Sequence, residues 1–165
     1  IPVPWKSVRY DAITHHFALD YLEQYKPKLL YIAYDETDEY AHEGKYDQYL
    51  IAAHRLDKYV GDLWNWIQKD YHYKNKTTIL ITTDHGRGHE TMDAWRNHGS
   101  SVTGAENVWM AVLGPDTPPK GEVLDNEPMT SSQVAATIAA FLGFEYSNER
   151  PVGPVMNSMF YDIKR

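Results

Sequence analysis

Three short groups of Asp and His residues are the part of this sequence best suited to chemistry. The first contains Asp38 and His42, which are four residues apart. On a helical turn both side chains point to the same side, so together they can chelate one ion. A carboxylate with an imidazole suits Zn²⁺ or a similar first-row divalent metal. The alternative for this pair alone is a solvated acidic loop with an incidental histidine.

The second group, Asp84-His85, follows an apolar, β-branched run and precedes Gly86 and Gly88. Adjacent side chains of a strand point to opposite faces, but the glycines permit a turn that brings both toward one ion. A capping Asp beside a loop histidine is the alternative. The third group is His98, in an Asn-His-Gly tripeptide. It gains meaning only from the other two groups.

The elements that must position these groups alternate between helices and apolar strands. Apolar spacing and β-forming runs predict helices over residues 7–25, 46–71 and 133–142, and strands over 28–34, 77–83 and 108–113. Thr130 or Ser131 is placed to cap the last helix. This alternation favours a single α/β domain over residues 1–165, with a mainly parallel sheet flanked by helices. Ligands collect beyond the carboxyl ends of such strands, where two of the clusters fall.

Composition excludes several classes of function. The net charge of −7 disfavours nucleic acid as a partner. The chain has no cysteine, which rules out disulfides, thiolate ligands and a cysteine nucleophile. No apolar run is long enough to predict a membrane span. The sequence is therefore that of an ordinary globular domain whose possible metal ligands are carboxylates and imidazoles.

Together the three groups resemble the alkaline phosphatase superfamily. The pattern is an Asp-x-x-x-His pair after one strand, an Asp-His-Gly after the next, and a His-Gly before a strand that ends in Gly-Pro. Its order and spacing, over roughly residues 29–142, are similar to those of the type I phosphodiesterase and nucleotide pyrophosphatase branch. The resemblance implies an incomplete alkaline-phosphatase-like core that acts on phosphate esters. It also implies two divalent ions, Zn²⁺ first and Mn²⁺ as the alternative.

The resemblance assigns each of the three groups to a metal ion. Asp38, His42 and His98 correspond to the ligands of one ion. Asp84 and His85 correspond to ligands of the second ion. In the superfamily the two ions clamp the phosphoryl group of the substrate.

The resemblance also leaves parts of the superfamily pattern without a counterpart. An upstream Asp ligand and the Thr or Ser nucleophile are not found in the chain, which begins at Ile1. We therefore expect this chain to be the C-terminal, metal-binding portion of a larger catalytic domain, inactive without the N-terminal segment. We expect Arg87 to contact oxygens of a small phosphate-ester substrate, or else to bridge to a surface acid. Glu36 and its acidic neighbours are expected to support the metal histidines or to face water.

Four alternatives stay open at the level of sequence. A sulfatase has a similar fold but binds Ca²⁺ through oxygen ligands, which three histidines argue against. A phosphoglycerate-mutase-like or phosphopentomutase-like enzyme with Mn²⁺ would carry much the same motifs. The remaining two are a non-catalytic metal-binding module and a structural domain without metal. Relatives are often periplasmic or secreted, which is the leading expectation for location.

Overall fold

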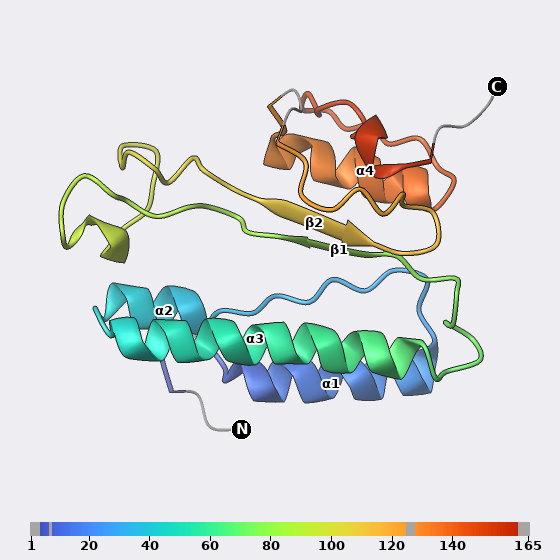
Figure 1. The fold of residues 1–165 in the computed structure, drawn as a ribbon, viewed down its shortest axis with the longest axis horizontal. Coiled ribbons are helices and arrows are strands. Elements are labelled where there is room, and N and C mark those ends of the chain that lie inside the picture. Colours follow the sequence, from blue (N-terminus) through green and yellow to red (C-terminus); the bar gives the residue numbers. More distant parts are fainter. Residues whose placement is uncertain (1–3, 7, 125–127, 162–165) are drawn as a thin grey trace. The chain divides into compact units, whose positions relative to one another are not determined.

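The computed structural model describes residues 4–6, 8–124 and 128–161. The chain divides into two compact units. The first unit comprises residues 1–74 and 87–105, and the second comprises residues 75–86 and 106–165 (Figure 1). The chain passes from one unit to the other more than once.

Three α-helices and a short 3₁₀-helix form the first unit. They are α1 (Asp11–Tyr25), α2 (Glu36–His42), α3 (Tyr46–Ile67) and η1 (Ala94–Arg96). Within this unit α3 packs against both α1 and α2 (Figure 1). Ala41 of α2 and Ala52 of α3 are 0% and 2% exposed, so both side chains belong to the core of this unit. The helices predicted over residues 7–25 and 46–71 are confirmed, with each true helix a few residues shorter.

The strand predicted over residues 28–34 is wrong. These residues form no strand, and they connect α1 to α2. Leu29 is 57% exposed and Tyr31 is 85% exposed, so the apolar run is not buried as a central strand would be. A run of apolar β-forming residues becomes a strand only where a neighbouring strand completes its backbone hydrogen bonds.

The second unit contains a two-stranded sheet and a helix. Its elements are β1 (Ile79–Thr82), β2 (Met110–Leu113), η2 (Ser131–Gln133), α4 (Val134–Phe141) and η3 (Asn157–Met159). A capping box between Thr130 and Gln133 begins the helical segment, which confirms the predicted cap. Thr137 is fully buried, and its hydroxyl accepts a hydrogen bond of 3.0 Å from the Met156 N–H. This bond holds the C-terminal segment on α4.

The expected mainly parallel sheet is not what the described residues form. β1 and β2 are antiparallel, with Ile79 opposite Leu113 and Thr82 opposite Met110. A parallel pair requires a crossover connection, usually an α-helix. The connection between these strands contains only η1 and irregular backbone, and the chain returns antiparallel. The structure is accordingly a mixture of helices with a small sheet, compatible with a fragment of an α/β fold.

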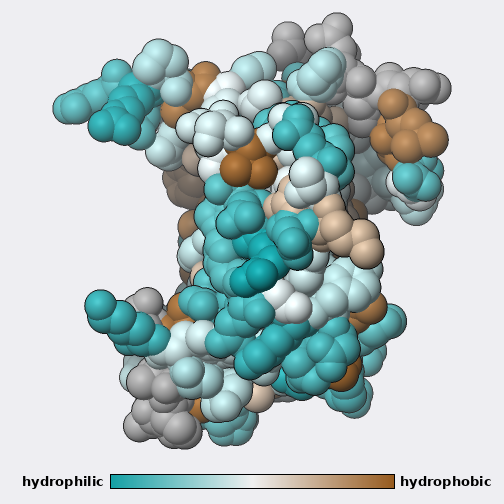
Figure 2. All heavy atoms as spheres, turned by 90° about the vertical axis from the view of Figure 1, so that its left-hand side faces the viewer, coloured by the Kyte–Doolittle hydropathy of each residue, from teal (hydrophilic) through white to brown (hydrophobic). Residues whose placement is uncertain are grey.

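Hydrophilic residues predominate on the face drawn in Figure 2, and hydrophobic residues are scattered among them. Among the described residues, no helix combines the length and apolar character that crossing a membrane requires.

Candidate metal centre

Helix α2 places two of the predicted ligands side by side. Asp38 and His42 are separated by one helical turn, and the Asp38 Oδ2 atom lies 3.3 Å from the His42 Nε2 atom. Their side chains are 36% and 40% exposed, so an ion from solvent can reach both. The helical geometry expected from their spacing is therefore present.

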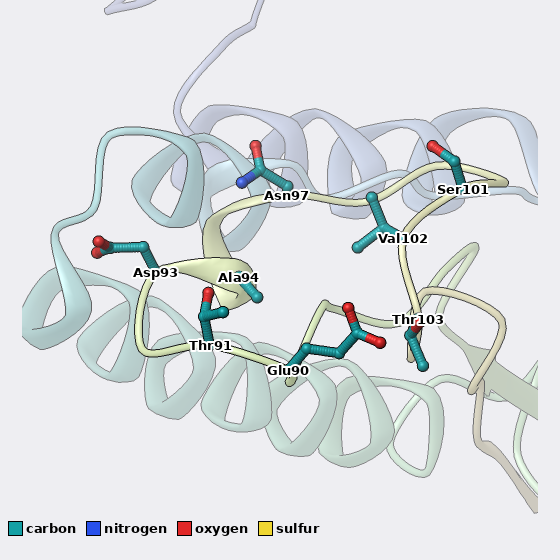
Figure 3. Close-up of a pocket in the computed structure, with 8 residues that line it drawn as sticks. All are labelled: Glu90, Thr91, Asp93, Ala94, Asn97, Ser101, Val102 and Thr103. Carbon is teal, nitrogen blue, oxygen red and sulfur yellow. The ribbon is translucent and has the colours of Figure 1, made fainter.

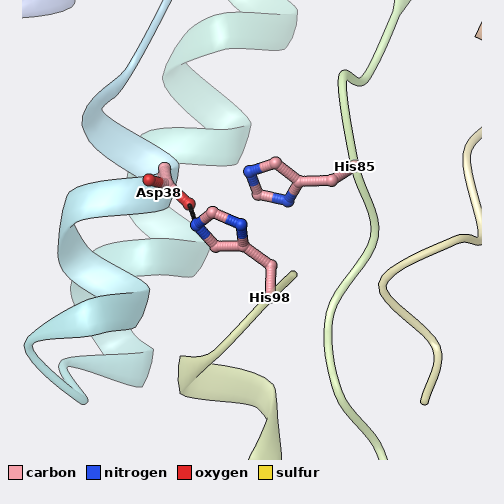
Figure 4. A group of neighbouring side chains, drawn as sticks. All are labelled: Asp38, His85 and His98. Carbon is pink, nitrogen blue, oxygen red and sulfur yellow. Dashed lines mark ion pairs between the residues drawn. The ribbon is translucent and has the colours of Figure 1, made fainter. Parts of the chain in front are cut away.

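The loop of residues 87–105 brings the third predicted ligand of this group to α2. The His98 Nε2 atom lies 3.0 Å from the His42 Nε2 atom and 3.7 Å from the Asp38 Oδ1 atom. Figure 4 shows the imidazole of His98 directed at the Asp38 carboxylate. Three residues separated by up to 60 positions in the sequence thus place their donor atoms together within the first unit.

The donor set fits a divalent ion of the zinc type. Ligand atoms bound to a tetrahedral zinc at about 2.0–2.1 Å lie about 3.3 Å from one another. The observed separations of 3.0, 3.3 and 3.7 Å, the last two measured to different oxygens of Asp38, bracket this spacing. Two imidazoles with one carboxylate also match zinc in ligand type. The fourth position of such a site would be open to water or substrate, as in catalytic zinc sites.

Two arginines join the loop of residues 87–105 to α2. Arg87 donates a hydrogen bond to the carboxylate of Asp38 and a second, of 3.4 Å, to the carbonyl oxygen of Arg96. Arg96 donates a hydrogen bond of 3.1 Å to the carbonyl oxygen of His42. Arg87 therefore bridges to an acid, one of the two alternatives given by the sequence, and that acid is a predicted ligand.

Close backbone packing fixes the start of the same loop at Gly88. A Cβ atom at Gly88 would lie 2.5 Å from the carbonyl oxygen of Ala94 and 2.8 Å from Cγ1 of Val102. The Gly88 N–H also donates a hydrogen bond of 3.1 Å to the carbonyl oxygen of Asn97, next to His98. Glycine is thus required here for packing.

Replacing Gly88 with alanine is expected to lower the free energy of unfolding by about 1–3 kcal/mol, because the added methyl group overlaps backbone atoms. Gly61→Ala is the matched control: it lies in α3 with nothing within 4 Å of its Cβ position. That control is expected to stabilise the chain by up to about 1 kcal/mol. Urea unfolding of both variants measures the difference. A Gly88→Ala variant as stable as the wild type would contradict the packing argument.

Asp84 and His85 lie in the second unit, just after β1. The His85 N–H donates a hydrogen bond of 3.0 Å to Oδ1 of Asp84. The His85 Nδ1 atom lies 2.9 Å from the carbonyl oxygen of Gly86. Because a carbonyl only accepts hydrogen bonds, Nδ1 carries the hydrogen, and in the neutral ring Nε2 presents its lone pair. That tautomer suits metal binding through Nε2.

A shallow hollow of about 330 Å³ lies within the loop of the first unit (Figure 3). Its lining residues are Glu90, Thr91, Asp93, Ala94, Asn97, Ser101, Val102 and Thr103. The lining includes two carboxylates and no Lys, Arg or His side chain. This hollow is therefore unsuited to a phosphate group, in contrast to the neighbourhood of Arg87.

Comparison with known families shows which family the chain belongs to. The sequence of residues 3–130 matches the family described as type I phosphodiesterase / nucleotide pyrophosphatase. The chain belongs to this family. The match covers most of the 165 residues and includes every predicted metal ligand, so the resemblance found in the sequence is confirmed. No curated protein and no solved structure matches the chain.

Membership of the phosphodiesterase family places the chain among phosphoester hydrolases. The family is typically metal-dependent, in agreement with the donor atoms gathered at Asp38, His42 and His98. The roles of these residues as ligands stay predictions, as do those of Asp84 and His85.

Two acidic residues near the candidate metal ligands were missed or misplaced by the sequence interpretation. Glu36 neither supports a metal histidine nor faces water: it is fully buried and accepts a hydrogen bond of 2.7 Å from Nη1 of Arg55. Asp11, at the start of α1, is 2% exposed, and its carboxylate accepts hydrogen bonds from the N–H groups of Asp35 and Glu36. The signal was an acidic residue at the first position of each helix, a place where carboxylates act as caps.

Burial raises the pKa of Asp11 to about 6, because desolvation disfavours the charged carboxylate and the charges of Glu36 and Asp35 repel it. Hydrogen bonds from the backbone of the same two residues act in the opposite direction. The charge of Asp11 in turn adds to the effect of burial in raising the pKa values of Tyr34 and Tyr59. The pKa of His15, which lies in the same core, is lowered mainly by burial.

This pKa predicts a fall in stability with rising pH. The folded chain holds the Asp11 proton between about pH 4 and pH 6, whereas the unfolded chain releases it near pH 4. Asp11 therefore makes its full contribution to stability below pH 4, and this contribution is lost as the pH rises through about 6. The total loss is about 3 kcal/mol at most. Asp11→Asn abolishes this dependence. Urea unfolding of the metal-free proteins measures the effect. Between pH 4.5 and pH 7.5, the free energy of unfolding of the variant is expected to rise relative to that of the wild type.

His15 gives a pH dependence of stability opposite to that of Asp11, and comparing the wild type with Asp11→Asn cancels it. A histidine with a lowered pKa stabilises the fold above its unfolded pKa and loses that contribution as pH falls. His15 is present in both proteins, so its effect cancels in the difference. A constant difference between the two proteins across this range would contradict the raised pKa of Asp11.

Proposed function

We propose that this chain is the metal-binding part of a phosphodiesterase that hydrolyses phosphate diesters or pyrophosphates with two zinc ions. The observation that carries this proposal is the meeting of the Asp38 carboxylate with the Nε2 atoms of His42 and His98, in a member of the phosphodiesterase family. These three residues would hold the first ion. Asp84 and His85 would hold the second.

Each protein group has a distinct task in this proposal. When bound, the two ions would supply positive charge that stabilises the phosphoryl group during displacement. Asp38 and the histidines fix the coordination geometry. The hydrogen bond from His85 Nδ1 to the Gly86 carbonyl keeps Nε2 in the metal-binding tautomer.

Arg87 is proposed to bind the substrate as well as to orient a ligand. Its guanidinium group has five N–H donors in a planar fork. Its contacts with the Asp38 carboxylate and the Arg96 carbonyl engage Nη2 and Nη1 and hold the fork beside the donor cluster. A phosphoryl oxygen near the first ion would lie within reach of the same group. The nucleophile is proposed to come from a segment outside this chain.

The test is hydrolysis by the zinc-loaded product of the complete reading frame that encodes this chain. Three chromogenic substrates separate the alternatives: bis(4-nitrophenyl) phosphate, 4-nitrophenyl phosphate and 4-nitrophenyl sulfate. The diester is expected to be hydrolysed with the highest kcat/KM. His98→Ala is expected to abolish that activity, while His54→Ala, at an exposed position of helix α3, leaves it unchanged. Preference for the sulfate ester, or no activity on either phosphate ester, would contradict the proposal.

A further inference from the structure

Helices α1 and α2 each begin without a side-chain cap of their own. The residues before them, Tyr10 and Asp35, make no capping hydrogen bond with their side chains. The first N–H groups of a helix have no partner inside it and need acceptors from elsewhere. In this unit the acceptors come from the other helix.

The exchange is reciprocal and buried. Oδ1 of Asp11, the first residue of α1, accepts hydrogen bonds of 2.9 Å from Asp35 N–H and 3.4 Å from Glu36 N–H. Oε1 of Glu36, the first residue of α2, accepts a hydrogen bond of 2.9 Å from Asp11 N–H. Asp11 is 2% exposed and Glu36 is 0% exposed. We call these two residues the carboxylate exchange.

The carboxylate exchange lies at the start of α2, the helix that carries two of the proposed metal ligands. Asp38 and His42 follow Glu36 by two and six positions on the seven-residue helix α2. An isolated helix of this length is not stable in water, so its position depends on what anchors it. Arg96 anchors its C-terminal end through the His42 carbonyl oxygen. The carboxylate exchange anchors its N-terminal end.

Burying two carboxylates at the starts of two helices costs free energy. Both lose hydration, and their charges repel each other. An apolar contact between the helix ends would avoid these costs but would not fix direction, whereas hydrogen bonds to backbone N–H groups fix both position and orientation. The arrangement therefore favours accurate placement of α2 over maximal stability.

From this we infer that Asp11 is a positioning residue for the metal centre: its carboxylate holds the first turn of α2 so that Asp38 and His42 face one ion. The inference rests on the proposed function, because it assumes that these two residues bind metal. Asp11 lies 27 positions before Asp38 in the sequence and acts on the ion only through α2.

The experiment is zinc titration by calorimetry of the metal-free 165-residue chain and its variants. Asp11→Ala removes the acceptor and is expected to weaken zinc binding by about 10–100-fold, as loss of a supporting partner does. Asp11→Asn keeps an oxygen acceptor at a cap and is expected to bind within about twofold of the wild type. Asp11→Glu keeps the charge but shifts the carboxylate by one methylene group, so weaker binding is expected. If Asp11→Ala does not fold, the zinc affinity of Asp11→Glu tests the inference in its place.

Leu22→Ala separates positioning from general destabilisation. Leu22 is buried on the same helix, about 16 Å along it from Asp11. Its truncation is expected to cost about 2–5 kcal/mol of stability and to leave zinc affinity unchanged in folded protein, as verified by circular dichroism. Equal affinity of the wild type, Asp11→Ala and Asp11→Glu would overturn the inference and leave the metal site intact. A wild type that does not bind zinc would overturn the proposed function, and the inference with it.

Discussion

Replacing His98 with alanine is expected to weaken zinc binding by more than about 100-fold, which exceeds the loss caused by removing a mere supporting partner of a ligand. The variant loses one of the three proposed donors. In the wild type, the Nε2 atom of His98 lies 3.0 Å from the Nε2 atom of His42. The remaining Asp38 and His42 form a two-ligand site on one helix. Calorimetric titration of the metal-free chain measures the change.

The matched control for this experiment is His54→Ala. His54 lies on the exposed side of α3 and belongs to none of the three ligand groups. Its replacement removes the same side chain and is expected to leave zinc binding unchanged. If His98→Ala bound zinc as tightly as the control, His98 would not be a ligand, and the first site would consist of α2 alone.

Replacing Arg55 with methionine is expected to lower the free energy of unfolding by about 3 kcal/mol, because it leaves the buried Glu36 carboxylate without its cation. Glu36 is fully buried, and its Oε2 atom accepts the 2.7 Å hydrogen bond from Arg55. The Arg55 side chain itself is 38% exposed, so water partly replaces it and the effect falls at the lower end of the range for buried pairs. Urea unfolding provides the measurement.

Two further variants show whether the unpaired charge is the cause. Lys58→Met removes the cation of the exposed Lys58–Asp62 pair on the same helix and is expected to change stability by less than about 0.5 kcal/mol. Glu36→Gln combined with Arg55→Met removes both charges and is expected to recover part of the lost stability. A double variant as unstable as Arg55→Met alone would show that lost packing of the arginine stem is responsible.

The proximity of Asp38 and His42 could be predicted because it follows from their local spacing. Asp38 and His42 needed only a helical turn between them, and the structure supplies it. The approach of His98 was inferred from motif order, through the resemblance that the family match confirms. For Asp84 and His85, which lie in the second unit, the structure shows only the local geometry.

Long-range partnerships of polar residues could not be predicted in the same way. Neither Asp11 nor Glu36 belongs to a motif, and their exchange of hydrogen bonds arises only when α1 and α2 meet. The antiparallel pairing of β1 and β2 was missed for a similar reason: strand direction depends on the path of the connection, which apolar periodicity does not encode. A β-forming run such as residues 28–34 likewise gains a strand only from a partner.

The central claim is that Asp38, His42 and His98 hold one divalent ion, and diffraction from zinc-soaked crystals of the chain at the zinc absorption edge tests it most directly. We predict an anomalous peak at about 2.0–2.2 Å from one oxygen of Asp38 and from both Nε2 atoms. Zinc bound elsewhere, with these three side chains unoccupied, would contradict the account, as would the absence of any zinc peak at saturating concentration.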